Sequence, residues 1–169
     1  MIFKFLMVCF FLVCSFVYVF FPKNNIDYGP INLIDQSCCV DEMILMEWSG
    51  PKAQIVWKDN KRTFYCDVKE IFYEIFNDIL RNRIRHIYVQ DFSGLDWNAY
   101  SDKWILAEDA VYVIDSNKKG AMNLSYVPFS NRDKAILFMK ENGGILLKFC
   151  DINRDVFDSS YKKNMSRVG

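Results

Sequence analysis

The sequence is poor in the groups that most enzymes use. Its single histidine, His86, lies in an alternating stretch with no nucleophile beside it, so no acid–base or nucleophilic arrangement is visible. Phosphate-binding glycine loops are also absent, and Gly143 and Gly144 are typical of a helix end. The 21 basic residues balance the 21 acidic ones, which removes the positive excess that nucleic-acid binding requires. The sequence therefore predicts neither an enzyme nor a nucleic-acid-binding protein.

The six cysteines lack the CxxC spacing of zinc sites. Two of them, Cys9 and Cys14, lie in an apolar segment, where cysteine behaves as a small hydrophobic residue. The other four are Cys38, Cys39, Cys66 and Cys150. Adjacent cysteines rarely bridge each other. A disulfide from Cys150 to either Cys38 or Cys66 is possible, and the sequence does not decide between them. Otherwise Cys66 and Cys150 are more typical of packing residues than of metal ligands.

The N-terminus contains the one long apolar run, from Phe5 to Phe21, interrupted only by Ser15. The run is at the short end of what spans a bilayer and exceeds a signal-peptide core of about 7–15 residues. We therefore expect residues 1–22 to form an uncleaved transmembrane anchor or a signal segment, followed by a linker over residues 23–37. Cleavage after Ser15 and a lipid anchor at Cys14 are the alternatives, and the flanking lysines barely decide orientation.

The hydrophobic pattern after the linker predicts two similar units. Alternation on both sides of Asn60 indicates a hairpin, and Asp67 with Glu70 forms a capping box before a helix over residues 68–80. A strand over residues 84–90 follows. The second half repeats this order, with strands over residues 104–106 and 111–114, a helix over 131–141 capped by Ser130, and a strand over 145–149.

We therefore predict an α+β fold of two small ββαβ units, at about residues 50–92 and 104–151, within one domain over residues 38–151. Residues 152–169 are predicted to be a polar C-terminal tail. The residues expected to be largely buried are Ile55, Trp57, Val68, Ile71, Ile75, Ile87, Val89, Val111, Val113, Ile136, Met139 and Leu146.

Seven short blocks follow one another between residues 50 and 149. They read GPKAQI, YCDVKEIF, IYVQDFSGLDW, WILAEDAVYVIDS, KGAM, VPFSN and ENGG. In this order and spacing the chain, over roughly residues 38–150, resembles the NosL family, the membrane-attached copper-binding accessory proteins of nitrous oxide reductase assembly and their relatives with other copper clients. The resemblance implies two ββαβ units, a fold shared with organomercurial lyase (MerB), and a domain exported to the periplasm or extracytoplasmic side.

Soft-metal chemistry fits the residues ahead of the first hairpin. Cuprous ion prefers thiolate and thioether sulfur, and Cys38, Cys39 and Met43 lie within one short segment. Met122 lies in the KGAM loop, where no core pattern explains its large apolar side chain. The resemblance implies a cysteine, glycine, methionine motif and a glycine, glycine, methionine motif, whose methionines match Met43 and Met122. We therefore predict a copper(I) site made of Cys38, Cys39, Met43 and Met122, although Met43 is equally typical of a core residue.

One departure from the family pattern concerns this site. The motif cysteine falls on Asp41 and the motif glycine on Glu42, while an earlier family cysteine matches Cys38. Three interpretations follow: the thiolate has moved to Cys38 or Cys39, Asp41 is a weak oxygen ligand, or the site is degenerate. The first hypothesis is a copper chaperone for a client cuproenzyme. The second is an assembly or interaction module without metal, and an enzyme related to organomercurial lyase ranks last.

Overall fold

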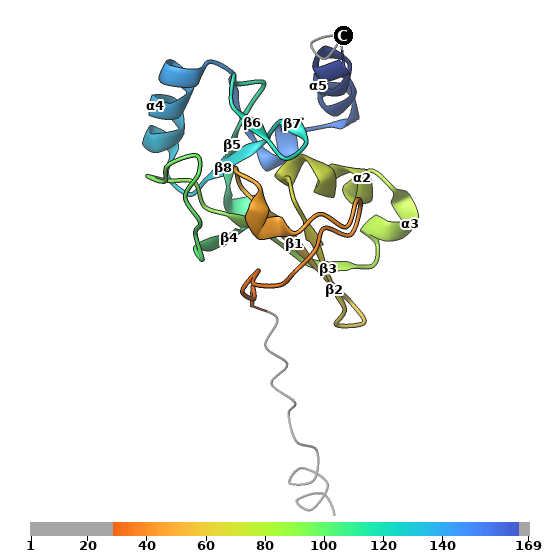
Figure 1. The fold of residues 1–169 in the computed structure, drawn as a ribbon. Coiled ribbons are helices and arrows are strands. Elements are labelled where there is room, and N and C mark those ends of the chain that lie inside the picture. Colours follow the sequence, from red (N-terminus) through yellow and green to blue (C-terminus); the bar gives the residue numbers. More distant parts are fainter. Residues whose placement is uncertain (1–28, 166–169) are drawn as a thin grey trace, which may run out of the picture.

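The structure, a computed structural model, describes residues 29–165, and the predicted anchor lies outside this range. Between residues 29 and 165, no helix combines the length and the apolar character needed to cross a bilayer. Short helices and strands alternate along the described chain (Figure 1). The prediction of a mixed helix and sheet fold is confirmed.

The first sheet has four antiparallel strands in the order β2-β1-β3-β4. Their bounds are Ala53–Trp57 for β1, Arg62–Tyr65 for β2, Ile84–Gln90 for β3 and Trp104–Leu106 for β4. The predicted hairpin is confirmed as β1 and β2, with Asn60 at φ 68° in the turn, a conformation that asparagine tolerates better than most residues. β4 corrects the predicted division into units, because it pairs with β3 in the first sheet.

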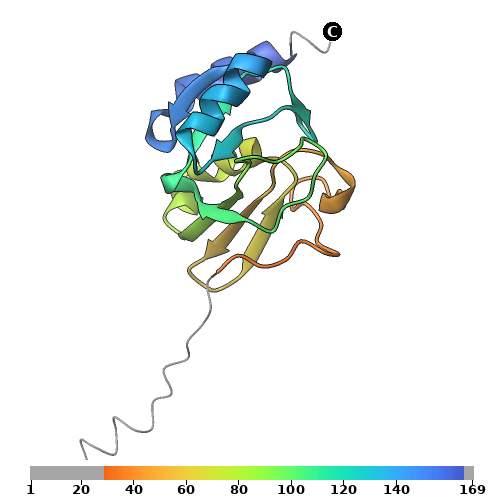
Figure 2. The same cartoon turned by 90° about the vertical axis from the view of Figure 1, so that its left-hand side faces the viewer.

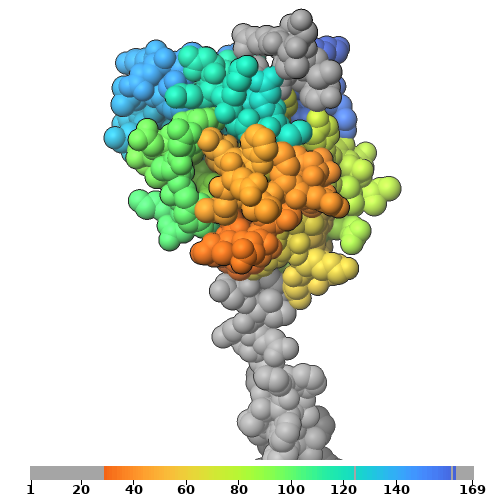
Figure 3. All heavy atoms as spheres, in the orientation of Figure 1, coloured from red at the N-terminus to blue at the C-terminus, as the bar shows by residue number. Residues whose placement is uncertain are grey.

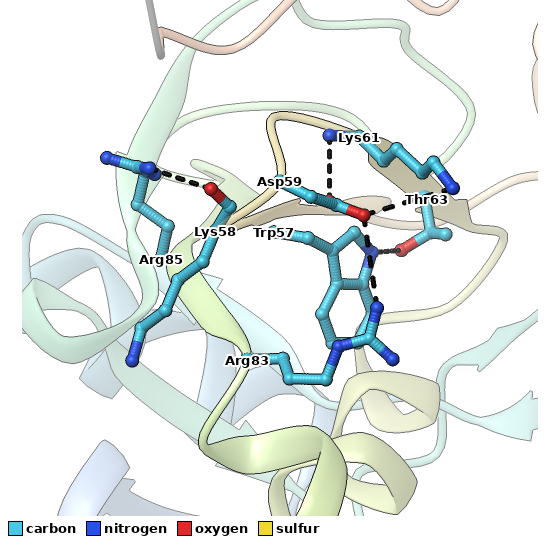
Figure 4. A network of polar contacts seen from close by, with 7 residues as sticks. All are labelled: Trp57, Lys58, Asp59, Lys61, Thr63, Arg83 and Arg85. Atoms are coloured by element: carbon cyan, nitrogen blue, oxygen red, sulfur yellow. Dashed lines mark hydrogen bonds and ion pairs between the residues drawn. The ribbon is translucent and has the colours of Figure 1, made fainter.

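The turn of this hairpin is held by exposed polar contacts (Figure 4). Asp59 lies 3.9 Å from both Lys61 Nζ and Arg83 Nη2, and the Lys58 carbonyl accepts a hydrogen bond of 2.9 Å from Arg85. Exposed ion pairs of this kind contribute about 0–1 kcal/mol. The network therefore orients the turn at one end of β2, whereas Cys66 follows the opposite end of the same strand.

The predicted helix over residues 68–80 is instead broken into three turns. They are the 3-10 turn η2 (Val68–Glu70), α2 (Ile71–Ile75) and α3 (Asp78–Arg81). The capping box of Asp67 and Glu70 is confirmed. The break occurs because Asn77 acts as a second N-cap, accepting hydrogen bonds from the backbone of Ile79 and Leu80, and Ile79 is consequently exposed.

The second sheet has three antiparallel strands in the order β8-β5-β9. Their bounds are Val111–Ile114 for β5, Val127–Phe129 for β8 and Ile145–Lys148 for β9, and α4 (Arg132–Asn142) connects β8 to β9. The cap of α4 is Asn131, not Ser130 as predicted, because its side chain accepts hydrogen bonds from Asp133 and Lys134. Gly143 ends the helix at φ 70°, as expected.

The remaining elements are short, except for the last helix. They are η1 (Leu45–Glu47), η3 (Ala107–Asp109), the hairpin of β6 (Lys119–Gly120) and β7 (Asn123–Leu124), η4 (Phe149–Asp151) and α5 (Arg154–Met165). α5 corrects the prediction of a polar tail, because Phe157 is buried in the main core beside Phe72 and Phe76. Ile152 and Val156 also pack in this core, and three apolar anchors within a polar segment give little periodic signal in the sequence.

The main core lies between the two sheets and joins them into one body. The first sheet contributes Ile55 and Val89, and the second contributes Tyr112 and Ile114. Of the twelve residues predicted to be inside, six are buried, namely Ile55, Val68, Ile71, Ile87, Val89 and Val113. The other six are half-buried, and all but Ile136 pack against the two larger cores. The views in Figures 1 and 2 show α4 on the outer side of the second sheet.

Candidate metal centre

Four side chains with metal-binding groups converge beside the first sheet. They are Cys38, Asp41, Cys66 and Glu70, and one ligand atom of each lies within 4.8 Å of all the others. All except Asp41 are buried, and both cysteines are free thiols. Two sulfurs and two carboxylates at this spacing are within reach of a single ion.

A tight turn of the chain directs Cys38 into the cluster. The Cys38 amide donates to the Met43 carbonyl (2.9 Å), and the Glu42 amide donates to the Cys38 carbonyl (3.0 Å). Glu42 adopts φ 62°, a conformation that favours glycine, the residue that the family pattern places there. The Cys39 amide donates to the carbonyl of Phe64 in β2, and within this turn Cys38 is buried whereas Cys39 is exposed.

The capping box after β2 supplies the other half of the cluster. Cys66 directly follows β2, and Glu70 reaches back to the Asp67 amide at 3.2 Å. The same Glu70 oxygen, Oε2, accepts hydrogen bonds from Cys66 Sγ at 3.3 Å and Cys38 Sγ at 3.5 Å. Asp41 Oδ2 lies 3.7 Å from Cys66 Sγ on the exposed side. The other Glu70 oxygen, Oε1, is buried without a hydrogen-bond partner.

The burial of the cluster perturbs its titration. The interaction between the two thiols lowers the pKa of Cys38 to about 6, and the same interaction together with burial raises the pKa of Cys66. Burial raises the pKa of Glu70 to about 7. Lys52 is also buried, with a pKa lowered by burial, and it is the nearby cation that offsets these anions. The cluster thus holds protons that an incoming soft cation would displace.

The two predicted methionines lie on different walls of the site. Met43 is half-buried and packs with Leu33, Leu45 and Phe64 in the small core that contains both cysteines. Ala121 packs against the same core, so the β6–β7 loop that carries Met122 lies beside the cluster. Met122 itself is 38% exposed. Figure 3 shows the orange segment of residues 30–50 on one face, with the teal β6–β7 region adjoining it.

The β6–β7 loop is fixed by residues that have no metal-binding role. Trp97 Nε1 donates a hydrogen bond of 2.9 Å to the Lys119 carbonyl. Gly120 packs so closely that a Cβ atom there would lie 2.6 Å from Asp67 Oδ2 and 3.2 Å from Ser125 Cβ. The helix cap and the loop are therefore in direct contact.

The structure thus brings together a different thiol pair from the one expected. Cys38 joins Cys66, while Cys39 is exposed and is not part of the cluster found among residues 29–165. Sequence reasoning treated Cys66 as a packing residue or a disulfide partner of Cys150, and Glu70 only as a helix signal. The available clue was their spacing, since a cysteine directly before a capping box is carried by the same turn that directs the glutamate inward.

Two buried thiols beside two carboxylates on a mixed helix and sheet domain define a candidate soft-metal-binding module. The comparison with known families identifies the family to which this module belongs. The chain belongs to the NosL family, whose sequence profile matches residues 31–157.

Named relatives agree with this assignment. The chain is 35% identical over 116 residues to the copper-binding lipoprotein NosL of Achromobacter cycloclastes, covering 66% of this chain and 60% of that protein. It is 30% identical over 118 residues to the protein of the same name from Stutzerimonas stutzeri, covering 69% and 62%. The crystal structure of the copper chaperone NosL from Shewanella denitrificans superposes with a TM-score of 0.69 at 26% identity, covering 75% of this chain and 96% of that one. These proteins are named for copper binding or chaperoning and not for catalysis.

Proposed function

We propose that this protein binds copper(I) as an accessory protein and delivers it to a copper-requiring client enzyme. The observation that supports this function is the convergence of Cys38 and Cys66 in a family whose relatives are named for copper binding. Cuprous ion favours sulfur ligands and tolerates low coordination numbers, so two thiolates suffice to hold it. The carboxylates of Asp41 and Glu70 are harder ligands and serve better as hydrogen-bond acceptors for the thiols.

The thioethers complete the proposed site. Met43 packs beside the thiols, and Met122 approaches from the β6–β7 loop with part of its side chain in solvent. An exposed, weakly bound thioether is a suitable ligand for a transfer protein, because a ligand of the client can replace it while the thiolates still hold the ion. Cys39 is the alternative thiolate, reachable if the turn carrying it rearranges.

We also propose the membrane attachment and the internal repeat. Residues 1–22 would anchor the protein with its domain in the periplasm, supported by the apolar run and by relatives named lipoproteins. Equivalence of the two ββαβ units is supported by their matching strand orders, β2-β1-β3 and β8-β5-β9, each with helix between the last two strands in sequence.

A second function is favoured by Asp41, which occupies the position of the family cysteine. Loss of that thiolate would leave an assembly or interaction module without metal. The two functions differ in one measurable property, the affinity of the reduced protein for copper(I).

The test is competition between the reduced full-length protein, in detergent, and a chromophoric copper(I) chelator. We expect one bound ion, with Cys38→Ser and Cys66→Ser each weakening binding about a hundredfold or more because the remaining thiolate lacks its partner. Cys39→Ser and Cys150→Ser are matched controls, since both thiols are exposed. If the unaltered protein binds no copper(I), the chaperone function is wrong and the interaction module replaces it. If Cys39→Ser abolishes binding, the thiolate assignment moves to Cys39.

A further inference from the structure

Cys38 and Cys66 lie close together in the fold, which makes the pair a candidate for a disulfide as well as for a metal site. Their sulfur atoms lie within 4.8 Å of each other, and both thiols donate hydrogen bonds to the same oxygen, Oε2 of Glu70. Their backbones are tied together, because the Cys39 amide donates to the Phe64 carbonyl at 2.9 Å, one residue away from Cys38 and two from Cys66. Both thiols are free, and closing the bond requires the sulfur atoms to approach from within 4.8 Å to about 2.05 Å.

We propose that Cys38 and Cys66 form a reversible disulfide that closes the metal site. The inference rests on the proposed function, because the same two sulfurs are the copper ligands assigned above. A sulfur atom engaged in a disulfide is no longer a thiolate, so oxidation and copper binding exclude each other. The redox state of the pair then decides whether the protein loads copper.

The oxidant is a small-molecule disulfide, and the exchange balances in two steps. The Cys38 thiol loses its proton and its sulfur attacks one sulfur of the small disulfide, which breaks that bond and expels a small thiolate that takes up the proton. The Cys66 sulfur then attacks the sulfur of Cys38, displacing the second small thiol, to which the Cys66 proton passes. In total, two protein thiols lose two electrons and two protons, and one small disulfide becomes two thiols.

The other cysteines of the domain are less suitable partners. Cys39 follows Cys38 directly but is exposed where Cys38 is buried, and a bond between adjacent cysteines would force both side chains to one side of the segment. Cys150 is exposed in η4, with its thiol directed to Asp151 (3.7 Å). The pair Cys38 and Cys66 is therefore the one that the fold has already brought together.

The experiment uses the full-length protein in detergent, equilibrated in glutathione buffers of increasing oxidised fraction. Acid stops the exchange, free thiols are then alkylated with a maleimide in denaturant near neutral pH, and tryptic peptides are analysed by mass spectrometry. We expect a cross-link between the peptide of residues 24–52 and the peptide of residues 63–69. The Cys39→Ser variant should keep this cross-link, whereas Cys38→Ser should lose it, which identifies the partner within the first peptide.

Copper binding of the oxidised and reduced forms is then compared by chelator competition. We expect oxidation to weaken copper(I) binding about a hundredfold or more, and dithiothreitol to restore it. If the reduced protein binds copper but no cross-link forms, or if the cross-link persists in Cys38→Ser, the disulfide inference is wrong and the proposed function stands. If the cross-link forms but the reduced protein binds no copper, the proposed function is wrong. If the oxidised form binds copper as tightly as the reduced form, the pair does not control the site.

Discussion

Two junctions between a strand and a helix share the same order of strand, one linking residue and helix cap, but one junction is buried and the other is exposed. In the first sheet, Cys66 separates β2 from the cap Asp67, and in the second sheet Ser130 separates β8 from the cap Asn131. Cys66 and Asp67 are fully buried, whereas Ser130 and Asn131 are exposed. At the first junction the cap side chain is buried beside the cysteine cluster, whereas at the second junction the cap side chain is exposed to solvent.

The difference comes from what covers each junction. The turn that carries Cys38 and the β6–β7 loop cover the first, so Asp67 and Glu70 lose water and their pKa values rise. The second is solvated, and Ser130 bonds instead to Asp91, with its hydroxyl 2.5 Å from Oδ2 and its amide 2.9 Å from Oδ1. Whether a junction of this kind carries buried groups with shifted pKa values therefore depends on the segments packed over it more than on the local sequence.

The largest expected effect concerns the accessibility of the two positions. In a Ser130→Cys variant, we expect the new thiol to react with iodoacetamide about a hundred times faster or more than Cys66, because a buried thiol reacts only when its cover opens. Peptide-resolved mass spectrometry of timed samples measures both rates in one molecule. Unfolding in urea is the control and should make the rates similar. Equal rates in the folded protein would show that the first junction is not closed.

A second comparison concerns the two caps. Burial raises the pKa of Asp67 to about 6, so the folded state holds its proton between pH 4 and 6 where the unfolded state has released it. The stability of the protein therefore falls as pH rises through this window, by on the order of 3 kcal/mol at about 1.4 kcal/mol per pKa unit. Asp67→Asn keeps a cap oxygen and removes this charge.

We accordingly expect Asp67→Asn to stabilise the protein at pH 7.5 and to be nearly neutral at pH 4.5, measured by urea unfolding at both values. Asn131→Asp, at the exposed cap, is the matched control and should change stability by less than about 1 kcal/mol at either pH. A loss of stability in Asp67→Asn at pH 7.5 would mean that the charged carboxylate is compensated in the folded state. Glu70 keeps some pH dependence in both variants.

The first hairpin, the first helix cap and the end of the second helix could be predicted because their signals are local. The hairpin around Asn60, the capping box at Asp67 and the helix end at Gly143 each depend on residues close in sequence. The pairing of Cys38 with Cys66 depends on a turn docking against β2 across the chain, and no local pattern encodes it. β4 was placed in the wrong unit for the same reason.

The smallest expected effect is on copper(I) affinity, and it compares the two segments that cover the first junction, namely the turn that carries Cys38 and the β6–β7 loop. The turn carries Asp41, which belongs to the cluster, and the β6–β7 loop carries Met122, the proposed thioether ligand. If copper(I) is held by two thiolates and a thioether, Met122→Ala should weaken binding roughly tenfold, or about 1.4 kcal/mol, while Asp41→Ala changes it less than about twofold. Met46→Ala, which removes an exposed methionine from η1, is the matched control. Chelator competition on the reduced variants measures all three. A larger loss in Asp41→Ala than in Met122→Ala would make the turn, and not the loop, the wall that completes the site.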